Sequence, residues 1–154
     1  MLRIRRILFP TDFSEHAEHA WSYGLSFAKE FGAEIHLLHI VTPPPRLTEA
    51  YAVNFDPEAL VQALRAEATG TLDRLARTAK DLGLSCRTEI QIGVDFREII
   101  DYAKGHEIDL IVMATHGRTG LAHALLGSVT EKVVRKASCP VLTIKPPALK
   151  METP

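Results

Sequence analysis

The sequence has no strong excess of charge and no long hydrophobic run. Its 18 Lys and Arg residues nearly balance its 19 Asp and Glu residues, and the formal net charge of the 154 residues is −1. This balance creates no overall field that would attract nucleic acid or an anionic membrane. No apolar run approaches the ~20 residues needed to span a bilayer. The first residues lack the long apolar region of a signal peptide. We therefore expect no nucleic acid and no membrane as partners.

Cysteine is also scarce. Cys86 and Cys139 are the only two cysteines, and their spacing matches neither a metal site nor a redox motif. Such cysteines are typical of reduced thiols that pack as small hydrophobic side chains in a cytoplasmic protein. The sequence therefore predicts a cytoplasmic location.

The common catalytic and metal-binding signatures are missing as well. There is no Gly-x4-Gly-Lys-Ser/Thr loop, no Gly-x-Gly-x2-Gly fingerprint and no Gly-x-Ser-x-Gly elbow. His16 and His19 have helical spacing but no third ligand at a usual distance along the chain. His36 and His39 would face opposite sides of a strand. We expect no metal bound by protein ligands and no catalytic residues.

What the sequence does contain is an alternation of short apolar runs with amphipathic segments. The runs predict strands at 6–9, 34–41, 86–92, 110–113 and 141–144. Between them, helices are expected from Asp12 or Ser14 to Gly32, from Asp56 to about Leu82 with Gly83 as C-cap, from a capping box at 95–98, and at about 129–136. The inner face of the long helix is predicted to comprise Leu60, Leu64, Ala68, Leu72, Leu75 and Ala79. This order favours an α/β fold with an open, doubly wound, five-stranded parallel sheet and helices on both faces.

The chain is expected to form a single domain over residues 1–146, followed by a frayed tail at 147–154. The proline-rich stretch 42–55 is too long for a simple connector, and its shape stays open.

The stretch 108–145 carries the strongest functional signal. An apolar strand is followed by the glycine-rich segment 115–120 and then by Gly127 and Ser128. Ser128 and Glu131 fit a capping box that would open the last helix, with Ser128 as N-cap. Backbone N–H groups and the positive end of a helix dipole would then converge beyond the carboxyl end of a strand. In an open α/β sheet this is where phosphate groups bind.

This pattern resembles the phosphate-binding signature of the universal stress protein family, Gly-x2-Gly-x9-Gly-Ser/Thr. Gly117 and Gly127-Ser128 match it, whereas Ala114 replaces the first glycine. The resemblance extends from 7–12 to 140–144. It implies strand order 3-2-1-4-5 and a nucleotide site between the first and fourth strands. The implied ligand is ATP or ADP, with Mg²⁺ held through the phosphates. Because the common catalytic signatures are missing, we expect slow ATP hydrolysis at most.

The resemblance also implies which residues contact the nucleotide. The candidate binding residues are Pro10, Thr11, Asp12, Val41, Met113, Ala114, His116, Gly117, Arg118, Gly127, Ser128, Val129 and Thr130. Several of them have simpler explanations. Gly117 and Gly127 could be turn glycines, Asp12 could only cap a helix, and His116 and Arg118 could be solvated loop residues.

Two functions follow from this resemblance. The first is a nucleotide-binding regulatory module that acts in the stress response as a homodimer through the last strand (Val141, Leu142, Thr143 and Ile144). The second is a dimerisation and interaction domain that has lost nucleotide binding. The two functions differ in what they imply for Ala114. Nucleotide binding is compatible with alanine at this position only if φ is negative and the methyl group points away from the phosphates.

Overall fold

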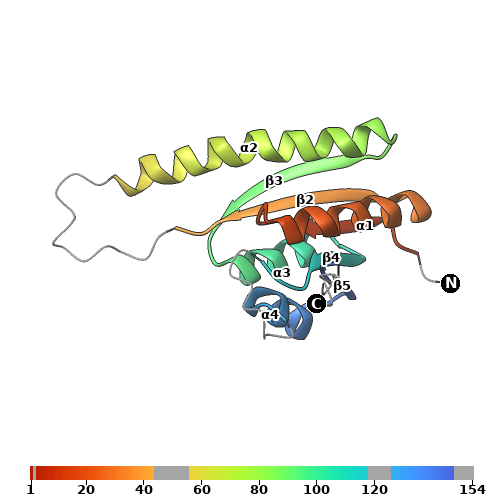
Figure 1. The fold of residues 1–154 in the computed structure, drawn as a ribbon. Coiled ribbons are helices and arrows are strands. Elements are labelled where there is room, and N and C mark those ends of the chain that lie inside the picture. Colours follow the sequence, from red (N-terminus) through yellow and green to blue (C-terminus); the bar gives the residue numbers. More distant parts are fainter. Residues whose placement is uncertain (2, 44–55, 118–125, 148–154) are drawn as a thin grey trace, which may run out of the picture.

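The computed structural model describes residues 1, 3–43, 56–117 and 126–147, which alternate strands with helices (Figure 1). In chain order the elements are β1 (Arg6–Pro10), α1 (Glu15–Phe31), β2 (Glu34–Val41), α2 (Pro57–Asp81), β3 (Cys86–Ile92), α3 (Asp95–Gly105), β4 (Leu110–Ala114), α4 (Ser128–Lys136) and β5 (Val141–Ile144). All strand pairs are parallel, and the sheet order is β3-β2-β1-β4-β5. The predicted fold class and strand order are confirmed.

Helices cover both faces of the sheet because successive side chains of the strands point to opposite faces. Ile7 and Phe9 of β1 pack in one hydrophobic cluster with Trp21 of α1 and Leu72 of α2. Leu8 packs in a second cluster, which contains Ile99 and Tyr102 of α3 and Val133 of α4. The central strands are therefore buried on both faces, as their continuous apolar runs predict.

The first two helices each have a side chain that accepts a backbone bond at the N-terminus. For α1 the sequence leaves Asp12 and Ser14 open as caps, and for α2 it predicts Asp56. Ser14 is the N-cap of α1, and its Oγ accepts from Ala17 N at 3.2 Å. Asp56 caps α2 by accepting from the N–H groups of Glu58 and Ala59. At the other end of α1, Gly32 adopts φ 64° and donates its N–H to the carbonyl of Ala28. This left-handed conformation ends the helix and favours glycine.

Two predicted capping boxes are wrong. The N-cap of α3 is Val94 and that of α4 is Gly127, and neither helix has a side-chain cap. Ser128 and Asp95 are already the first helical residues. The chain enters each of these helices one residue earlier than expected. The side chains of Asp95 and Ser128 therefore lie one residue past the N-cap, the position from which a capping bond is made. Asp95 instead accepts from the adjacent Phe96 N–H at 2.7 Å.

The C-terminal end of α2 also differs by one residue. The C-cap is Leu82 rather than Gly83. Gly83 follows the cap with φ 76° and donates its N–H to the carbonyl of Lys80 at 2.8 Å. The glycine therefore provides the left-handed turn, but one position beyond the predicted cap.

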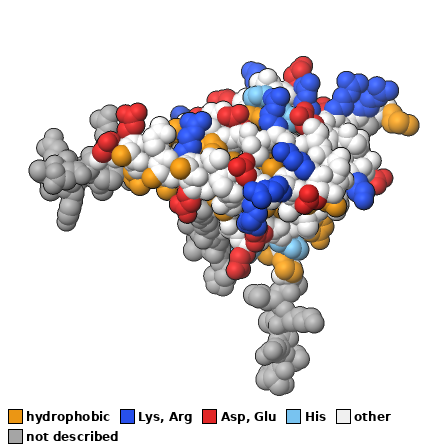
Figure 2. Space-filling model, turned by 90° about the horizontal axis from the view of Figure 1, so that it is seen from above, with side chains coloured by type: hydrophobic (Ala, Val, Ile, Leu, Met, Phe, Trp, Pro, Cys, Tyr) orange, Lys and Arg blue, Asp and Glu red, His pale blue; other side chains and the backbone are white. Residues whose placement is uncertain are grey.

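The predicted inner face of α2 is correct only for its C-terminal part. Ala68, Leu72, Leu75 and Ala79 are buried, but Leu64 is 36% exposed and Leu60 is half-buried. A helix of 25 residues is about 37 Å long, whereas a strand of seven residues spans about 23 Å. The first turns of α2 consequently extend past the sheet, and hydrophobic side chains lie at the surface there (Figures 1 and 2).

Some predictions fall outside the described residues. Of the tail predicted at 147–154, only residue 147 is described. Of the loop predicted at 42–55, only Thr42 and Pro43 are described. Within the described ranges, none of the helices is long and apolar enough to cross a membrane.

Candidate functional site

A crevice of about 800 Å³ opens where β1 and β4 lie side by side and end. This is the position at which ligands bind in open α/β sheets, and the volume falls in the range of small-molecule sites. The structure brings together every predicted site residue that it describes: Pro10, Thr11, Asp12, Val41, Met113, Ala114, His116, Gly117, Gly127, Ser128, Val129 and Thr130 all line the crevice. Arg118 lies outside the described residues.

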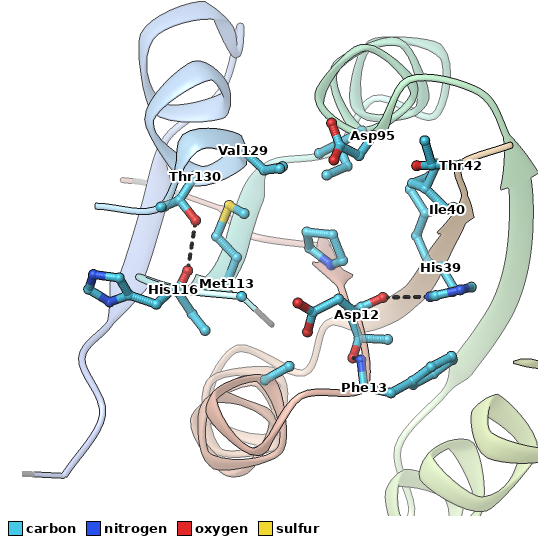
Figure 3. Close-up of a pocket in the computed structure, with 18 of the residues that line it drawn as sticks. Asp12, Phe13, His39, Ile40, Thr42, Asp95, Met113, His116, Val129 and Thr130 are labelled. Atoms are coloured by element: carbon cyan, nitrogen blue, oxygen red, sulfur yellow. Dashed lines mark hydrogen bonds between the residues drawn. The ribbon is translucent and has the colours of Figure 1, made fainter. Parts of the chain in front are cut away.

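Asp12 occupies the turn between β1 and α1 and does not itself cap the helix. Its Oδ1 accepts from Ser14 N at 3.0 Å, and Ser14 then provides the cap. Its Oδ2 lies beside Gly117, the residue that follows β4 by three positions. In Figure 3 the Asp12 carboxylate points into the middle of the crevice. Asp12 thus supplies a hydrogen-bond acceptor to the crevice.

The two signature glycines are sites of close approach. A Cβ added to Gly117 would lie 2.5 Å from Oδ2 of Asp12. A Cβ added to Gly127 would lie 3.3 Å from the carbonyl oxygen of Thr115, and Gly127 N donates to that oxygen at 2.7 Å. The glycines therefore let the β1–α1 turn, the residues after β4 and the start of α4 approach one another closely.

Ala114, which replaces a signature glycine, is the last residue of β4. Among the described non-glycine residues only Phe13 and Glu107 have positive φ, so the backbone at Ala114 does not require glycine. Ala114 belongs to the hydrophobic cluster beneath α1 and α2. Its carbonyl accepts from Oγ1 of Thr130 at 3.0 Å, which ties α4 to the end of β4 (Figure 3).

Two helices start at the crevice. α4 begins after Gly127, α3 begins after Val94, and neither N-terminus carries a side-chain cap. Figure 3 shows Asp95 at the start of α3 and Val129 at the start of α4 facing each other across the opening. Helix N-termini carry partial positive charge and backbone donors, which favour anions. The lining also contains the carboxylates of Asp12, Glu67, Asp95 and Glu131.

The end of β2 forms the opposite wall, and its backbone bonds show which residue faces the crevice. Alternate residues of a parallel strand direct their N–H and C=O groups to opposite neighbouring strands. The carbonyl of Leu38 accepts from Thr11 N at 2.9 Å, on the β1 side, whereas that of Val41 accepts from Gly93 N at 3.1 Å, on the β3 side. Ile40 therefore directs its peptide groups toward the space beyond Pro10. Val41 lines the crevice, but its carbonyl is turned away from it.

Several lining residues were not predicted from the sequence, and three of them are prominent: Phe13, His39 and Asp95. The rings of Phe13 and His39 stack with centroids 4.3 Å apart. The sequence could have indicated His39, because residues two apart on a strand point to the same face and Val41 was already a candidate. That His39 reaches the β1–α1 turn follows only once the register of β2 with β1 is known.

Histidine pairs do not form a metal centre in the described part of the chain. The rings of His16 and His116 lie 6.3 Å apart, at the start of α1 and after β4. No group of three or more His, Cys, Asp or Glu side chains among the described residues could hold a metal ion.

The titratable groups with shifted pKa values lie away from the crevice. Burial lowers the pKa of His36, which contacts Tyr102 OH at 2.9 Å through Nδ1, and burial raises the pKa of Tyr102. Burial also raises the pKa of Cys86 to about 11 and that of Cys139 above its usual range. Thiols with raised pKa values are poor nucleophiles near neutral pH, so they act here as packing residues.

A family model described as the universal stress protein family matches residues 3–145, which is almost the whole chain. The chain belongs to the universal stress protein family. Two curated relatives come from Methanocaldococcus jannaschii. Universal stress protein MJ0531 is 36% identical over 93% of this chain and 83% of its own length. Universal stress protein MJ0577 is 32% identical over 92% of this chain and 94% of its own length.

Solved structures give the same assignment. The structure of MJ0577 superposes with a TM-score of 0.84 at 34% identity, covering 95% of this chain and 99% of that one. UspA from Lactobacillus plantarum superposes with a TM-score of 0.83 at 30% identity, covering 92% and 98%. More distant universal stress proteins share the fold at 19% and 20% identity, with TM-scores of 0.70 and 0.65. The first of these is in complex with cAMP, and the second, from Archaeoglobus fulgidus, is in complex with dAMP.

Proposed function

We propose that this universal stress protein binds ATP or ADP in the crevice between β1 and β4 and acts as a dimeric, nucleotide-responsive regulatory module. One observation carries the proposal: the β1–α1 turn meets two segments about a hundred residues further along the chain around a single cavity. The two segments are the residues that follow β4 and the N-terminus of α4. The universal stress proteins in complex with cAMP and dAMP support a nucleotide as the class of ligand.

The phosphates belong at the start of α4 in this proposal. The first residues of α4 present backbone N–H groups without a side-chain cap, and the helix dipole favours negative charge there. Mg²⁺ would be held by phosphate oxygens, which are the ligands it prefers. His116 and Ser128, which also line this part of the crevice, would form its polar rim.

The nucleoside belongs between the β1–α1 turn and the end of β2. The peptide N–H and C=O of Ile40 point toward this space and provide a donor and an acceptor for the edge of an adenine base. The Asp12 carboxylate provides an acceptor for sugar hydroxyls or for an exocyclic amine. Ala114 is compatible with this arrangement, because its φ is not positive and it belongs to the hydrophobic cluster.

Calorimetric titration with ATP and Mg²⁺ tests the proposal. The wild type should bind, and Asp12→Ala should weaken binding by about 1–3 kcal/mol, or roughly five- to 150-fold. The matched control is Asp101→Ala, which removes an exposed carboxylate of α3 that does not line the crevice. Melting curves show whether each variant is folded.

Two outcomes would overturn parts of this proposal. If the wild type shows no binding at millimolar ATP, nucleotide binding is rejected, and a module that only dimerises and interacts takes its place. If the wild type binds but Asp12→Ala and Asp101→Ala bind equally well, the nucleotide lies elsewhere on the protein.

A further inference from the structure

The turn that carries Asp12 is held from the neighbouring strand by His39. Nδ1 of His39 lies 2.8 Å from the carbonyl oxygen of Thr11. A carbonyl can only accept, so Nδ1 carries the proton and donates it. The ring of His39 also stacks on that of Phe13, at an interplanar angle of 21°. One side chain of β2 thus contacts both residues that flank Asp12. Figure 3 shows His39 beside Phe13 and Asp12.

The conformation held in this way is an unusual one. Phe13 has φ 63°, in the left-handed region that bulky residues rarely adopt. Such residues persist where their surroundings impose the conformation, and they cluster at functional sites. Two local bonds also shape the turn: Phe13 N donates to Oγ1 of Thr11 at 3.1 Å, and Ser14 N donates to Oδ1 of Asp12 at 3.0 Å.

The consequence for the crevice is the direction of the Asp12 carboxylate. With the turn in this conformation, Oδ2 of Asp12 lies against Gly117, between the ends of β1 and β4. If the turn relaxed to negative φ at Phe13, the chain entering α1 would change direction and the carboxylate would leave this position. The contacts of His39 with Thr11 and Phe13 oppose that relaxation.

We propose that His39 is a positioning residue for nucleotide binding, which acts by holding the β1–α1 turn so that Asp12 faces the crevice. This inference rests on the proposed function, because it assigns Asp12 to the nucleoside. His39 acts through the hydrogen bond to Thr11 and the stack on Phe13. Its effect on affinity is therefore transmitted by Asp12.

Two amide substitutions, both of which remove the ring, test the hydrogen bond separately from the stack on Phe13. In His39→Asn the amide nitrogen can occupy the place of Nδ1 and donate to Thr11. In His39→Gln it lies near the place of Nε2 and cannot. Calorimetric titration with ATP and Mg²⁺ should give an affinity for His39→Asn within about threefold of wild type, and a loss of roughly five- to thirty-fold for His39→Gln. Equal losses for the two variants would overturn the proposal.

A double-mutant comparison tests whether the effect passes through Asp12. If it does, His39→Gln should change the affinity by less than about twofold when Asp12 is already alanine, because coupled residues are not additive. A full additional loss in the Asp12→Ala background would overturn the proposal and would show that His39 contacts the nucleotide itself.

A nucleotide-free measurement distinguishes this inference from the proposed function. Nitrogen NMR of the His39 ring should show the proton on Nδ1; a proton found only on Nε2 overturns the inference whether or not ATP binds. If the wild type binds ATP and Asp12→Ala weakens binding but His39→Gln does not, the positioning role alone fails. If the wild type does not bind, the proposed function fails, and the positioning role falls with it.

Discussion

At the scale of single residues, the contact between Asp12 and Gly117 joins the two halves of the crevice. The two residues follow β1 and β4, which pair through two registered positions, Ile7↔Leu110 and Leu8↔Ile111. Among the described residues no further registered pair joins these strands, and Oδ2 of Asp12 lies against the Gly117 backbone. Glycine is therefore needed at position 117 to leave room for the Asp12 carboxylate, whether or not a ligand is bound.

Gly117→Ala should consequently weaken nucleotide binding. The φ of Gly117 is not positive, so the backbone accepts alanine, but the new methyl group would displace the Asp12 carboxylate. We expect a loss on the order of tenfold in ATP affinity, about 1.4 kcal/mol, measured by calorimetric titration. The control is Gly105→Ala in α3, where a Cβ meets no atom within 4 Å. An unchanged affinity for Gly117→Ala would show that the position of Asp12 is unimportant.

His36 is buried, and its lowered pKa predicts that stability depends on pH. It is 3% exposed, and it lies between Tyr102 and Glu34, with contacts of 2.9 and 3.4 Å. Burial lowers its pKa below 6.5; nearby Glu34 opposes this shift, while Arg87 and His106 add to it. Because the folded state resists protonation, the unfolded state binds more protons below about pH 6.5, and stability falls as pH falls through that value toward the lower folded-state pKa.

The prediction is that wild-type stability falls between about pH 8 and about pH 5 more than that of His36→Asn. The asparagine oxygen can accept from Tyr102 OH without titrating. Urea unfolding at several pH values gives the slope of the free energy of unfolding against pH for each protein. The other six histidines are common to both proteins, so their contributions largely cancel in the difference between the two slopes. Identical slopes would mean that His36 does not resist protonation in the folded state.

At the scale of secondary structure, the sequence predicts those boundaries that a side chain marks. The strands appear as short apolar runs, and the starts of α1 and α2 follow from Ser14 and Asp56, which accept backbone bonds. The starts of α3 and α4 could not be placed to the residue, because Val94 and Gly127 carry no capping side chain. There the start of the helix depends on how the preceding strand leaves the sheet, which is a tertiary effect.

Gly70 gives a test of local propensity within α2. It lies in a continuous helix of 25 residues, and a Cβ there would meet no atom within 4 Å. Gly70→Ala should therefore raise the free energy of unfolding by about 0.5–1 kcal/mol. Gly32→Ala is the matched control with the opposite sign, since φ 64° at the end of α1 should cost alanine about 1–2 kcal/mol. Urea denaturation measures both; destabilisation by Gly70→Ala would contradict the account.

At the scale of the whole molecule, the sheet order leaves β3 and β5 at the edges. An edge strand with apolar residues tends to pair with another chain, and we propose that β5 pairs antiparallel with β5 of a second copy to form a two-fold dimer. The carbonyl of Pro140 accepts from Ile111 N of β4, and that of Ile144 accepts from N of Thr115, the residue that follows β4. Leu142 bonds to β4 in the same way, so the outward N–H groups belong to Val141 and Thr143.

Thr143→Pro should therefore produce monomers, because proline removes an outward donor without breaking the β4–β5 ladder. Thr88→Pro is the matched control on the opposite edge: Ser85 and Gly93 bond toward β2, so Thr88 N–H also points outward. Sedimentation at micromolar concentration should show dimers for wild type and Thr88→Pro. Monomeric wild type would count against the dimer, and a dimeric Thr143→Pro protein would place the interface elsewhere.

Some residues of the candidate site can be found from the sequence, and others only from the arrangement of the whole sheet. Asp12, Gly117 and Gly127 can be found from motif spacing, and the structure places them at one crevice. That Ile40 rather than Val41 directs its peptide groups into the crevice, and that His39 reaches Thr11, depends on the register of β2 with β1. Register is set by pairing across the whole sheet, and the residues of a single strand do not encode it.

The proposed ligand, ATP or ADP, should occupy the crevice where β1 and β4 end. A crystal structure of the protein grown with saturating ATP and Mg²⁺ would locate it. We expect the base at the peptide groups of Ile40, the sugar beside Asp12, and the phosphates at the N-terminus of α4. An empty crevice under these conditions, or a nucleotide bound at any other surface, would contradict the proposal.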